Sequence, residues 1–141
     1  MEINWDDIDD SIDELSFKGE IKYGKVVSVY DCDKFKIVFL LNGKLYKWHC
    51  RLNNVDTPEL RAFNDPEKEL AYYIRHQIKE KILNQIVKIK CGEFDENGRI
   101  LVEIYINEKE NLNQWLVDNK MAFEYNGGTK KDWNQILENT N

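Results

Sequence analysis

The sequence has 141 residues, of which 42% are hydrophobic and 12% aromatic, so the chain is long and apolar enough for one domain with a buried core. No apolar run approaches the roughly 20 residues that a membrane-spanning helix requires, which excludes such a helix and predicts a soluble protein. The formal net charge of −6 by itself argues against a nucleic-acid partner, because phosphate is bound mainly by Lys and Arg.

The negative charge is concentrated at the start of the chain. The first 20 residues hold eight acids and one base, a net charge of −7, which leaves 19 bases and 18 acids in residues 21–141, a net charge of +1. We therefore predict an acidic N-terminal arm over residues 1–19 and a single domain over residues 20–141. A neutral domain can still carry a local basic groove for a polyanion.

The chain begins without the basic and apolar segments of a secretory signal, so we expect an intracellular protein. Its three cysteines, Cys32, Cys50 and Cys91, are an odd number and lack the paired short spacing of a zinc site. We therefore expect them to be reduced thiols that behave as small buried hydrophobes.

The first predicted elements follow the arm. Within the arm, Ile8, Ile12 and Leu15 recur at helical spacing, and a short amphipathic helix, a folded-back arm and a disordered segment all fit its composition. Residues 21–30 and 35–41 then predict two strands that form a hairpin.

A turn at Asn42-Gly43 leads to a third predicted strand over residues 45–52. Apolar and polar residues alternate along it, and Arg51 lies on the polar face, so the strand is expected to be half-buried. Residues 53–65 contain Asn-Asn, Thr-Pro and Asn-Asp-Pro and predict a loop.

The second half of the chain predicts helices around a second hairpin. A core-facing helix begins with Asp65 as its cap, and its apolar residues recur every four positions, at Leu70, Ile74, Ile78 and Ile82. Strands are predicted over residues 87–91 and 100–104 on either side of a turn at Asn97-Gly98, then a helix from Asn111 or Asn113 to Lys120 and a last helix near residues 130–138.

This order of elements predicts an α+β fold that is mainly β. Three strands, a helix, two strands and C-terminal helices are the order of a five-stranded OB-fold barrel closed by about three helices. Barrels of this type commonly bind oligonucleotides.

Three short motifs carry acids and arginines whose types suit phosphate chemistry. The central tract runs from Arg51 to Asp56-Thr57-Pro58-Glu59, after Asp31-Cys32-Asp33 and before Asp95-Glu96-Asn97-Gly98-Arg99. Asp33 and Asp56 can supply hard oxygen ligands to one divalent cation. Arg51 and Arg99 can each grip a phosphate through two hydrogen bonds and stabilise its developing charge. Any one of these residues alone fits a solvated turn, and only their joint spacing favours a catalytic site.

The joint pattern resembles the staphylococcal nuclease family, whose signatures are Asp-Gly-Asp-Thr, then Arg-Leu followed by Val-Asp-Thr-Pro-Glu, then Tyr/Asn-Gly-Arg. The resemblance covers about residues 24–125. It implies one Ca²⁺ ion held by Asp33, Asp56 and the carbonyl of Thr57. It also implies that Glu59 is the general base, that Arg51 and Arg99 contact the scissile phosphate, and that Tyr125 lies near the nucleotide.

The first motif departs from the family pattern at two positions. Cys32 replaces the usual Gly, which would be strained if the position needs a positive φ angle. Lys34 replaces the usual Thr, and it is either a weak phosphate contact or, as we favour, a solvated side chain.

The resemblance implies a Ca²⁺-dependent nuclease that cleaves DNA and/or RNA with low base specificity and leaves 3′-phosphates. The alternative is a non-catalytic module that binds nucleic acid or protein, similar to the nuclease-like domains of the Tudor-SN family. The sequence retains both arginines and all three acids, which favours the enzyme over the non-catalytic module. The acidic arm is either a solvated tail, which we favour, or a segment that binds an unknown partner or competes with substrate.

Overall fold

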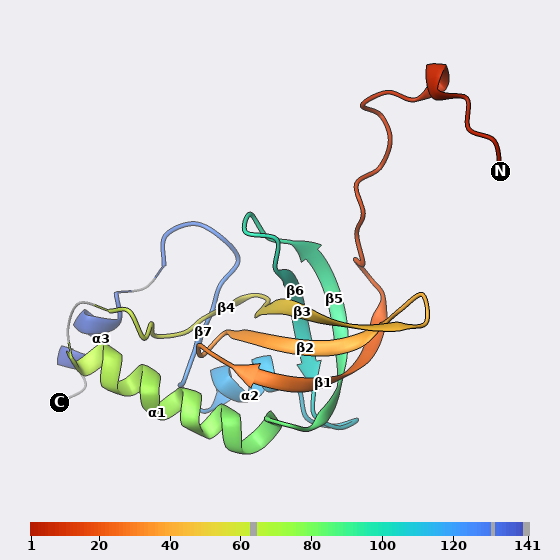
Figure 1. The fold of residues 1–141 in the computed structure, drawn as a ribbon. Helices are drawn as coiled ribbons and strands as arrows, with labels where there is room; N and C mark the ends of the chain where they lie inside the picture. Colours follow the sequence, from red (N-terminus) through yellow and green to blue (C-terminus); the bar gives the residue numbers. More distant parts are fainter. Residues whose placement is uncertain (63–64, 131, 140–141) are drawn as a thin grey trace.

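The computed structural model describes residues 1–62, 65–130 and 132–139. Within these residues, five strands close a barrel in the order β1-β2-β3-β6-β5, and β5 also pairs with β1 (Figure 1). The strands are β1 (Ile21–Val29), β2 (Lys34–Leu41), β3 (Lys44–Leu52), β5 (Ile86–Phe94) and β6 (Ile100–Tyr105). Neighbouring strands are antiparallel except β3 and β6, which run parallel. The predicted OB-fold barrel is therefore confirmed.

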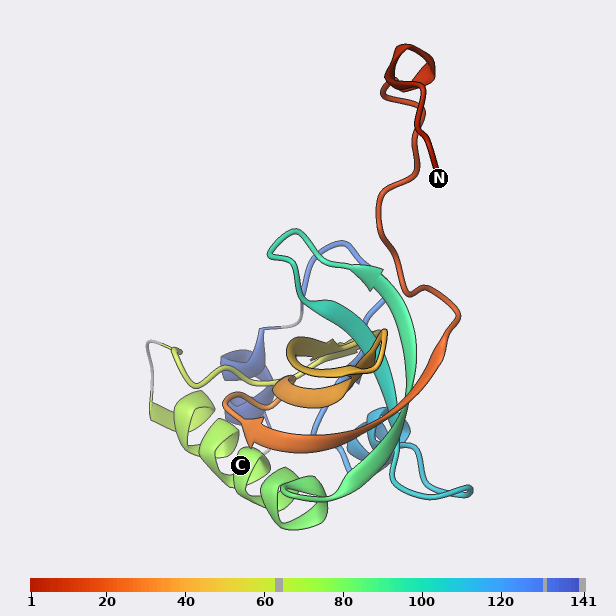
Figure 2. The ribbon, with the colours of Figure 1, turned by 45° about the vertical axis from the view of Figure 1, so that its right-hand side comes forward.

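The described residues form three α-helices outside the barrel: α1 (Asp65–Ile82), α2 (Leu112–Asp118) and α3 (Trp133–Asn139). In two views α1 lies across one side of the barrel, close to β1 (Figures 1 and 2). Pro66 fits the first turn of α1, where no backbone N–H donor is needed. None of the helices in the described part of the chain is long and apolar enough to span a bilayer.

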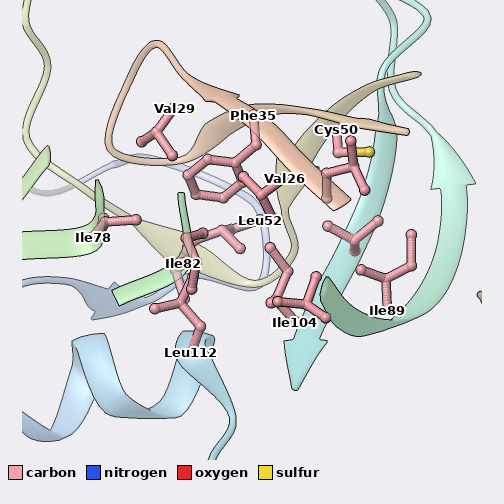
Figure 3. Packing of buried hydrophobic residues seen from close by; sticks show 14 of the residues in the cluster. Val26, Val29, Phe35, Cys50, Leu52, Ile78, Ile82, Ile89, Ile104 and Leu112 are labelled. Atoms are coloured by element: carbon pink, nitrogen blue, oxygen red, sulfur yellow. The ribbon is translucent and has the colours of Figure 1, made fainter. Parts of the chain in front are cut away.

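The core fills the barrel and the space between the barrel and its helices. Figure 3 shows Ile78 and Ile82 of α1 and Leu112 of α2 in the same apolar cluster as Phe35 and Leu52 of the barrel. Ile74, Ile78 and Ile82 are fully buried, as the four-residue periodicity predicts. The cysteines are buried and free, which also agrees with the sequence.

The barrel closes tightly where β1 crosses β2. A Cβ atom at Gly24 would lie 2.7 Å from the carbonyl oxygen of Val38 and 2.8 Å from the Ile37 side chain. Glycine is therefore required here for close approach of two backbones.

The predicted loop over residues 53–65 contains a short strand that the sequence did not indicate. This strand, β4 (Val55–Asp56), pairs antiparallel with β7 (Phe123–Glu124). Cys32 does not have the positive φ angle that its glycine-like position suggested. Its buried Sγ instead donates a hydrogen bond to the carbonyl of Ala71 at 3.1 Å, which fixes the Asp31–Asp33 turn against α1.

The acidic arm leads away from the barrel in both views (Figures 1 and 2). It contains one 3₁₀ turn, η1 (Trp5–Asp7), and residues 1–16 are all exposed. The root of the arm, residues 16–19, is fixed by Phe17. This residue is buried, and its ring lies 5.2 Å from that of Trp48. The Gly19 N–H also donates to the Cys91 carbonyl at 2.8 Å.

Candidate active site

Four of the charged residues that the motifs contain lie together at one end of the barrel. The Nε atom of Arg51, near the end of β3, lies 3.4 Å from Asp33 Oδ2, just before β2. On its other side, Arg51 Nη1 lies 3.8 Å from Asp95 Oδ2. Arg99 Nη1 lies 3.7 Å from the same Asp95 oxygen. Barrel closure thus joins the three motifs through a chain of ion pairs, which we call the barrel cluster: Asp33, Arg51, Asp95 and Arg99.

Asp95 organises the turn between β5 and β6. Its Oδ1 accepts the backbone N–H groups of Asn97 at 2.8 Å and Arg99 at 2.9 Å, while Gly98 takes the positive φ angle of 77° that the turn requires. The Asp95 side chain is only 3% exposed, and no hydrogen-bond donor among the described residues reaches its Oδ2. This buried oxygen therefore faces both guanidinium groups as a charged partner.

Arg99 has a further partner on the barrel wall. Its Nε donates to the Tyr30 hydroxyl at 3.4 Å, and that hydroxyl lies 3.4 Å from Nδ1 of His49. The hydrogen bond with Tyr30, together with the charge of Asp95, raises the pKa of Arg99 above its usual value. Arg99 is thus a permanent positive charge held from two sides.

Asp33 is a buried carboxylate, with 7% of its surface exposed. Burial raises its pKa above the usual value, and the negative charge of Asp31 raises it further. The positive charges of Lys34, Arg51 and Lys130 oppose this effect without overcoming it. The ionised Asp33 is therefore incompletely compensated by its surroundings.

Asp56 and Thr57 lie on the segment that covers the barrel end, and both are buried. Asp56 is in β4, and its Oδ1 accepts a hydrogen bond from Nε1 of Trp133 at 3.4 Å. Trp133, in α3, also packs on Phe123 of β7, with ring centroids 4.8 Å apart. Segments from the C-terminal part of the chain therefore contact Asp56.

Glu59 is exposed, two residues beyond Thr57. Its surroundings are acidic, which is visible in the pKa of Glu67 on α1. Burial raises that pKa, and the charges of Glu59, Asp132 and Asp56 raise it further, although a hydrogen bond from the Glu59 backbone N–H opposes the shift. We call Asp56, Thr57, Glu59 and Glu67 the cover cluster.

Tyr125 and Lys34 lie at the edge of the site. Tyr125 lines a pocket of about 320 Å³ together with Arg51, Asp95 and Asn126. Its backbone N–H donates to Asn54, and its hydroxyl donates to the carbonyl of Gly128 at 2.7 Å. Lys34 Nζ lies 3.4 Å from Asp31 Oδ2, so it is half-buried in an ion pair rather than freely solvated.

The residues present have the donor chemistry that Ca²⁺ prefers. Carboxylate and carbonyl oxygens are its usual ligands, and the buried, undercompensated Asp33 is a group that a cation would stabilise. No set of three or more Cys, His, Asp or Glu side chains gathers as potential ligands in the part of the chain that the structure describes. Asp33, Asp56 and the carbonyl of Thr57 would therefore hold an ion only with water completing its shell.

The sequence reasoning assigned no role to several of these residues. Asp95 lies in the third motif, but an Asp two residues before Asn-Gly is so common in turns that the motif gives no sign of a role for its second oxygen. Tyr30, Glu67 and Trp133 are brought to the site only by tertiary folding, and no motif marks them.

Together these features define the class: a small OB-fold protein with arginines and acids gathered at one end of its barrel. Residues 49–140, more than half of the chain, match the family model described as Staphylococcal nuclease homologue. The chain belongs to this staphylococcal nuclease (SNase) family, as the motifs predicted.

Several relatives agree with this assignment. The chain is 28% identical to a protein named Probable endonuclease lcl3 from Emericella nidulans, over 68% of this chain and 41% of the relative. It is 34% identical to Uncharacterized protein MJ1439 from Methanocaldococcus jannaschii, over 64% of this chain and 51% of that protein. It is also 24% identical to Probable endonuclease LCL3 from Komagataella phaffii, over 86% of this chain and 64% of the relative. The chain thus spans less than two thirds of the length of each of these relatives.

Proposed function

We propose that this chain is a Ca²⁺-dependent nuclease that hydrolyses phosphodiester bonds of DNA and/or RNA with low base specificity. The observation that carries the proposal is the barrel cluster, in which Arg51 and Arg99 flank the same buried oxygen of Asp95. Two guanidiniums anchored together can contact one phosphate and stabilise the charge that develops during hydrolysis. Relatives named as probable endonucleases support the same reading.

The metal would be held by residues of both the barrel cluster and the cover cluster. Asp33 from the first, and Asp56 with the Thr57 carbonyl from the second, would be its protein ligands. When bound, the ion would supply positive charge beside the phosphate. It would also relieve the unfavourable burial of the ionised Asp33 carboxylate.

The remaining residues have roles that follow from their exposure and partners. Glu59 is exposed and negatively charged, so it can orient an attacking water and accept its proton. Tyr125 lines the pocket beside Arg51, where a sugar or base next to the phosphate would lie. Lys34, already paired with Asp31, would make at most a secondary contact with phosphate. Because these groups recognise phosphate and sugar rather than base edges, low base specificity follows.

The test is an assay of the purified chain on single-stranded DNA, double-stranded DNA and RNA, each with Ca²⁺, with Mg²⁺ and with EDTA. We expect cleavage in Ca²⁺ that stops in EDTA and returns when excess Ca²⁺ is added. Undiminished hydrolysis in EDTA would show that the metal assignment is wrong. Binding of nucleic acid without cleavage under every condition would instead identify a non-catalytic binding module.

A further inference from the structure

An unpartnered surface lies on the outer side of the barrel, where β1, β5 and β6 are neighbours. Strand register places Tyr23, Lys88 and Tyr105 in one row, and Ile21, Lys90 and Glu103 in the next. A third row joins Val38, Lys25 and Ile86. Each row thus has a lysine at its centre with at least one apolar or aromatic residue beside it, and the second row also holds Glu103. We call this surface the lysine face.

The lysine face is more apolar than a solvated sheet surface requires. Tyr23 is 68% exposed and Ile86 is 73% exposed, while Ile21 is also largely open to solvent. A pocket of about 260 Å³ lies between Tyr23, Ile86, Lys88 and Tyr105. A contiguous apolar patch with charged residues in it is typical of a protein-binding surface.

The acidic arm has the complementary properties. Trp5, Ile8, Ile12 and Leu15 recur at intervals of three and four, so on a helix they would form one apolar stripe. All four are exposed, Trp5 by 72%. Five aspartates lie between or beside them: Asp6, Asp7, Asp9, Asp10 and Asp13.

One 3₁₀ turn, η1 (Trp5–Asp7), already lies at the start of this segment. Asn4 has the extended backbone of a helix N-cap, and its Oδ1 accepts the N–H of Asp6 at 3.2 Å. Asp6 and Asp7 lie in the first turn, where negative charge is favourable. The arm therefore has a start signal and an apolar stripe, but an isolated helix this short is marginal without a surface to pack on.

The arm is directed away from the lysine face of its own chain. Its root continues along β5 beyond Cys91, and Ser16 and Lys18 both contact Glu93. Lys88 and Ile86 lie in the opposite direction along the same strand. The arm leads away from the barrel in Figure 2, so it would have to reverse its direction just before Phe17 to reach its own lysine face. A second copy can receive the arm without this reversal.

We propose that residues 4–15 of one chain fold as an amphipathic helix on the lysine face of a second copy, and that two chains exchange arms reciprocally. The apolar stripe packs on Ile21, Tyr23 and Ile86, and Trp5 enters the pocket beside Tyr105. The arm aspartates lie beside Lys25, Lys88 and Lys90. Because each copy gives one arm and receives one, the contact closes as a twofold dimer.

Nucleic acid fits the lysine face less well than the arm does. Ile21, Val38 and Ile86 have no flat ring on which a base could stack. The Tyr105 ring already contacts Lys88, whose Nζ lies 4.9 Å from its centroid, and the Tyr105 hydroxyl donates to Glu103 at 3.1 Å.

The test is the mass of the full chain in solution, measured by light scattering after size-exclusion chromatography. At about 0.05 M salt we expect twice the mass of one chain, and a shift toward single chains at about 0.5 M salt, where charges are screened. Deletion of residues 1–15, which leaves Phe17 in place, should give single chains at both. This readout does not depend on nuclease activity.

Charge reversal identifies the face. The double variant Lys25→Glu/Lys90→Glu should weaken dimerisation by roughly tenfold or more, because like charges would then meet across the contact. Adding Asp9→Lys/Asp10→Lys in the arm should restore most of the lost dimer affinity. The matched control Lys68→Glu/Lys120→Glu changes the same charge away from the lysine face and should leave the dimer intact.

Several results would overturn the proposal. These are single chains at every concentration, a dimer that survives deletion of the arm, or a dimer that the Lys25→Glu/Lys90→Glu variant does not weaken. If the same variant changes the part of the tryptophan fluorescence that Trp5→Phe removes, while the mass stays that of one chain, the arm binds its own barrel. If it lowers oligonucleotide affinity and leaves the mass unchanged, the face binds nucleic acid.

Discussion

The two clusters of the candidate active site are held in different ways. The barrel cluster lies on β3, on the turn before β2 and on the β5–β6 turn, and its members are joined by ion pairs and by hydrogen bonds within the turn. The cover cluster lies on β4, the following loop and α1, and Asp56 accepts a hydrogen bond from Trp133 of α3. Rigid strands position the phosphate-binding groups, whereas segments outside the barrel carry the remaining acids.

This difference separates the two tasks of a phosphate site. Guanidinium groups must be aligned with a phosphate, and alignment needs a fixed frame. Metal ligands and a general base can lie on segments that adjust, because Ca²⁺ accepts variable coordination geometry. We therefore expect substitutions in the barrel cluster to lower turnover. Substitution of Asp33, the proposed metal ligand in this cluster, should also change stability.

The largest effect is expected from changing the arginines while keeping their charge. Arg51→Lys or Arg99→Lys should retain the fold but lower kcat on the order of a hundredfold or more, because lysine cannot make two parallel hydrogen bonds to a phosphate. Steady-state kinetics with a fluorescent oligonucleotide would measure this. Arg75→Lys on α1 is the matched control. Near-normal turnover in both site variants would show that the arginines are not part of the active site.

A smaller effect is expected at Asp95, whose Oδ2 lies near both arginines and which is not among the residues proposed to contact the phosphate. Asp95→Asn keeps the Oδ1 acceptor for the turn and replaces the charged oxygen between the guanidiniums. We expect kcat to fall roughly tenfold with little change in melting temperature, because the arginines lose a shared charged partner.

Glu96→Gln is the control for Asp95→Asn, since Glu96 is exposed on the same turn. A double-mutant cycle with Arg99→Lys would show whether Asp95 acts through the arginines. If the two losses in kcat simply multiply, Asp95 does not position Arg99 and its role is confined to the turn.

The barrel could be predicted from the sequence because its signals are local. Alternation within each strand, Asn-Gly at two turns and the four-residue periodicity of α1 each depend on neighbouring residues only. The β4–β7 pairing could not be predicted in this way. A strand of two residues has no periodicity, and the partners Val55 and Glu124 are far apart in the sequence.

The same distinction between local sequence signals and contacts that form only on folding applies to the candidate site. Asp33, Arg51 and Arg99 lie in motifs whose spacing marks them, and their roles stay predictions until activity is measured. The shared contact of Asp95 exists only because closure of the barrel brings the end of β3 beside the β5–β6 turn. Trp133 reaches Asp56 from the far end of the chain, and a tryptophan on a helix gives no sign of such a partner.

The smallest effect is expected on stability at Asp33, the member of the barrel cluster that is also a proposed metal ligand. Its pKa is raised in the folded chain, so the folded state binds a proton there more tightly than the unfolded state. Such a group favours folding at low pH, and that contribution is lost as the pH rises through the folded pKa. At neutral pH the ionised Asp33 therefore destabilises the metal-free chain.

Removing that charge should reverse the effect. We expect Asp33→Asn to raise the melting temperature of the metal-free chain by a few degrees at pH 7, and to abolish the further rise that Ca²⁺ gives the unsubstituted chain. Thermal melts in EDTA and in Ca²⁺ would measure both quantities. Asp13→Asn, an exposed acid of the arm, should change neither. If Asp33→Asn lowers stability in EDTA, the ion pair with Arg51 outweighs the burial of the carboxylate, and the site needs no cation to compensate it.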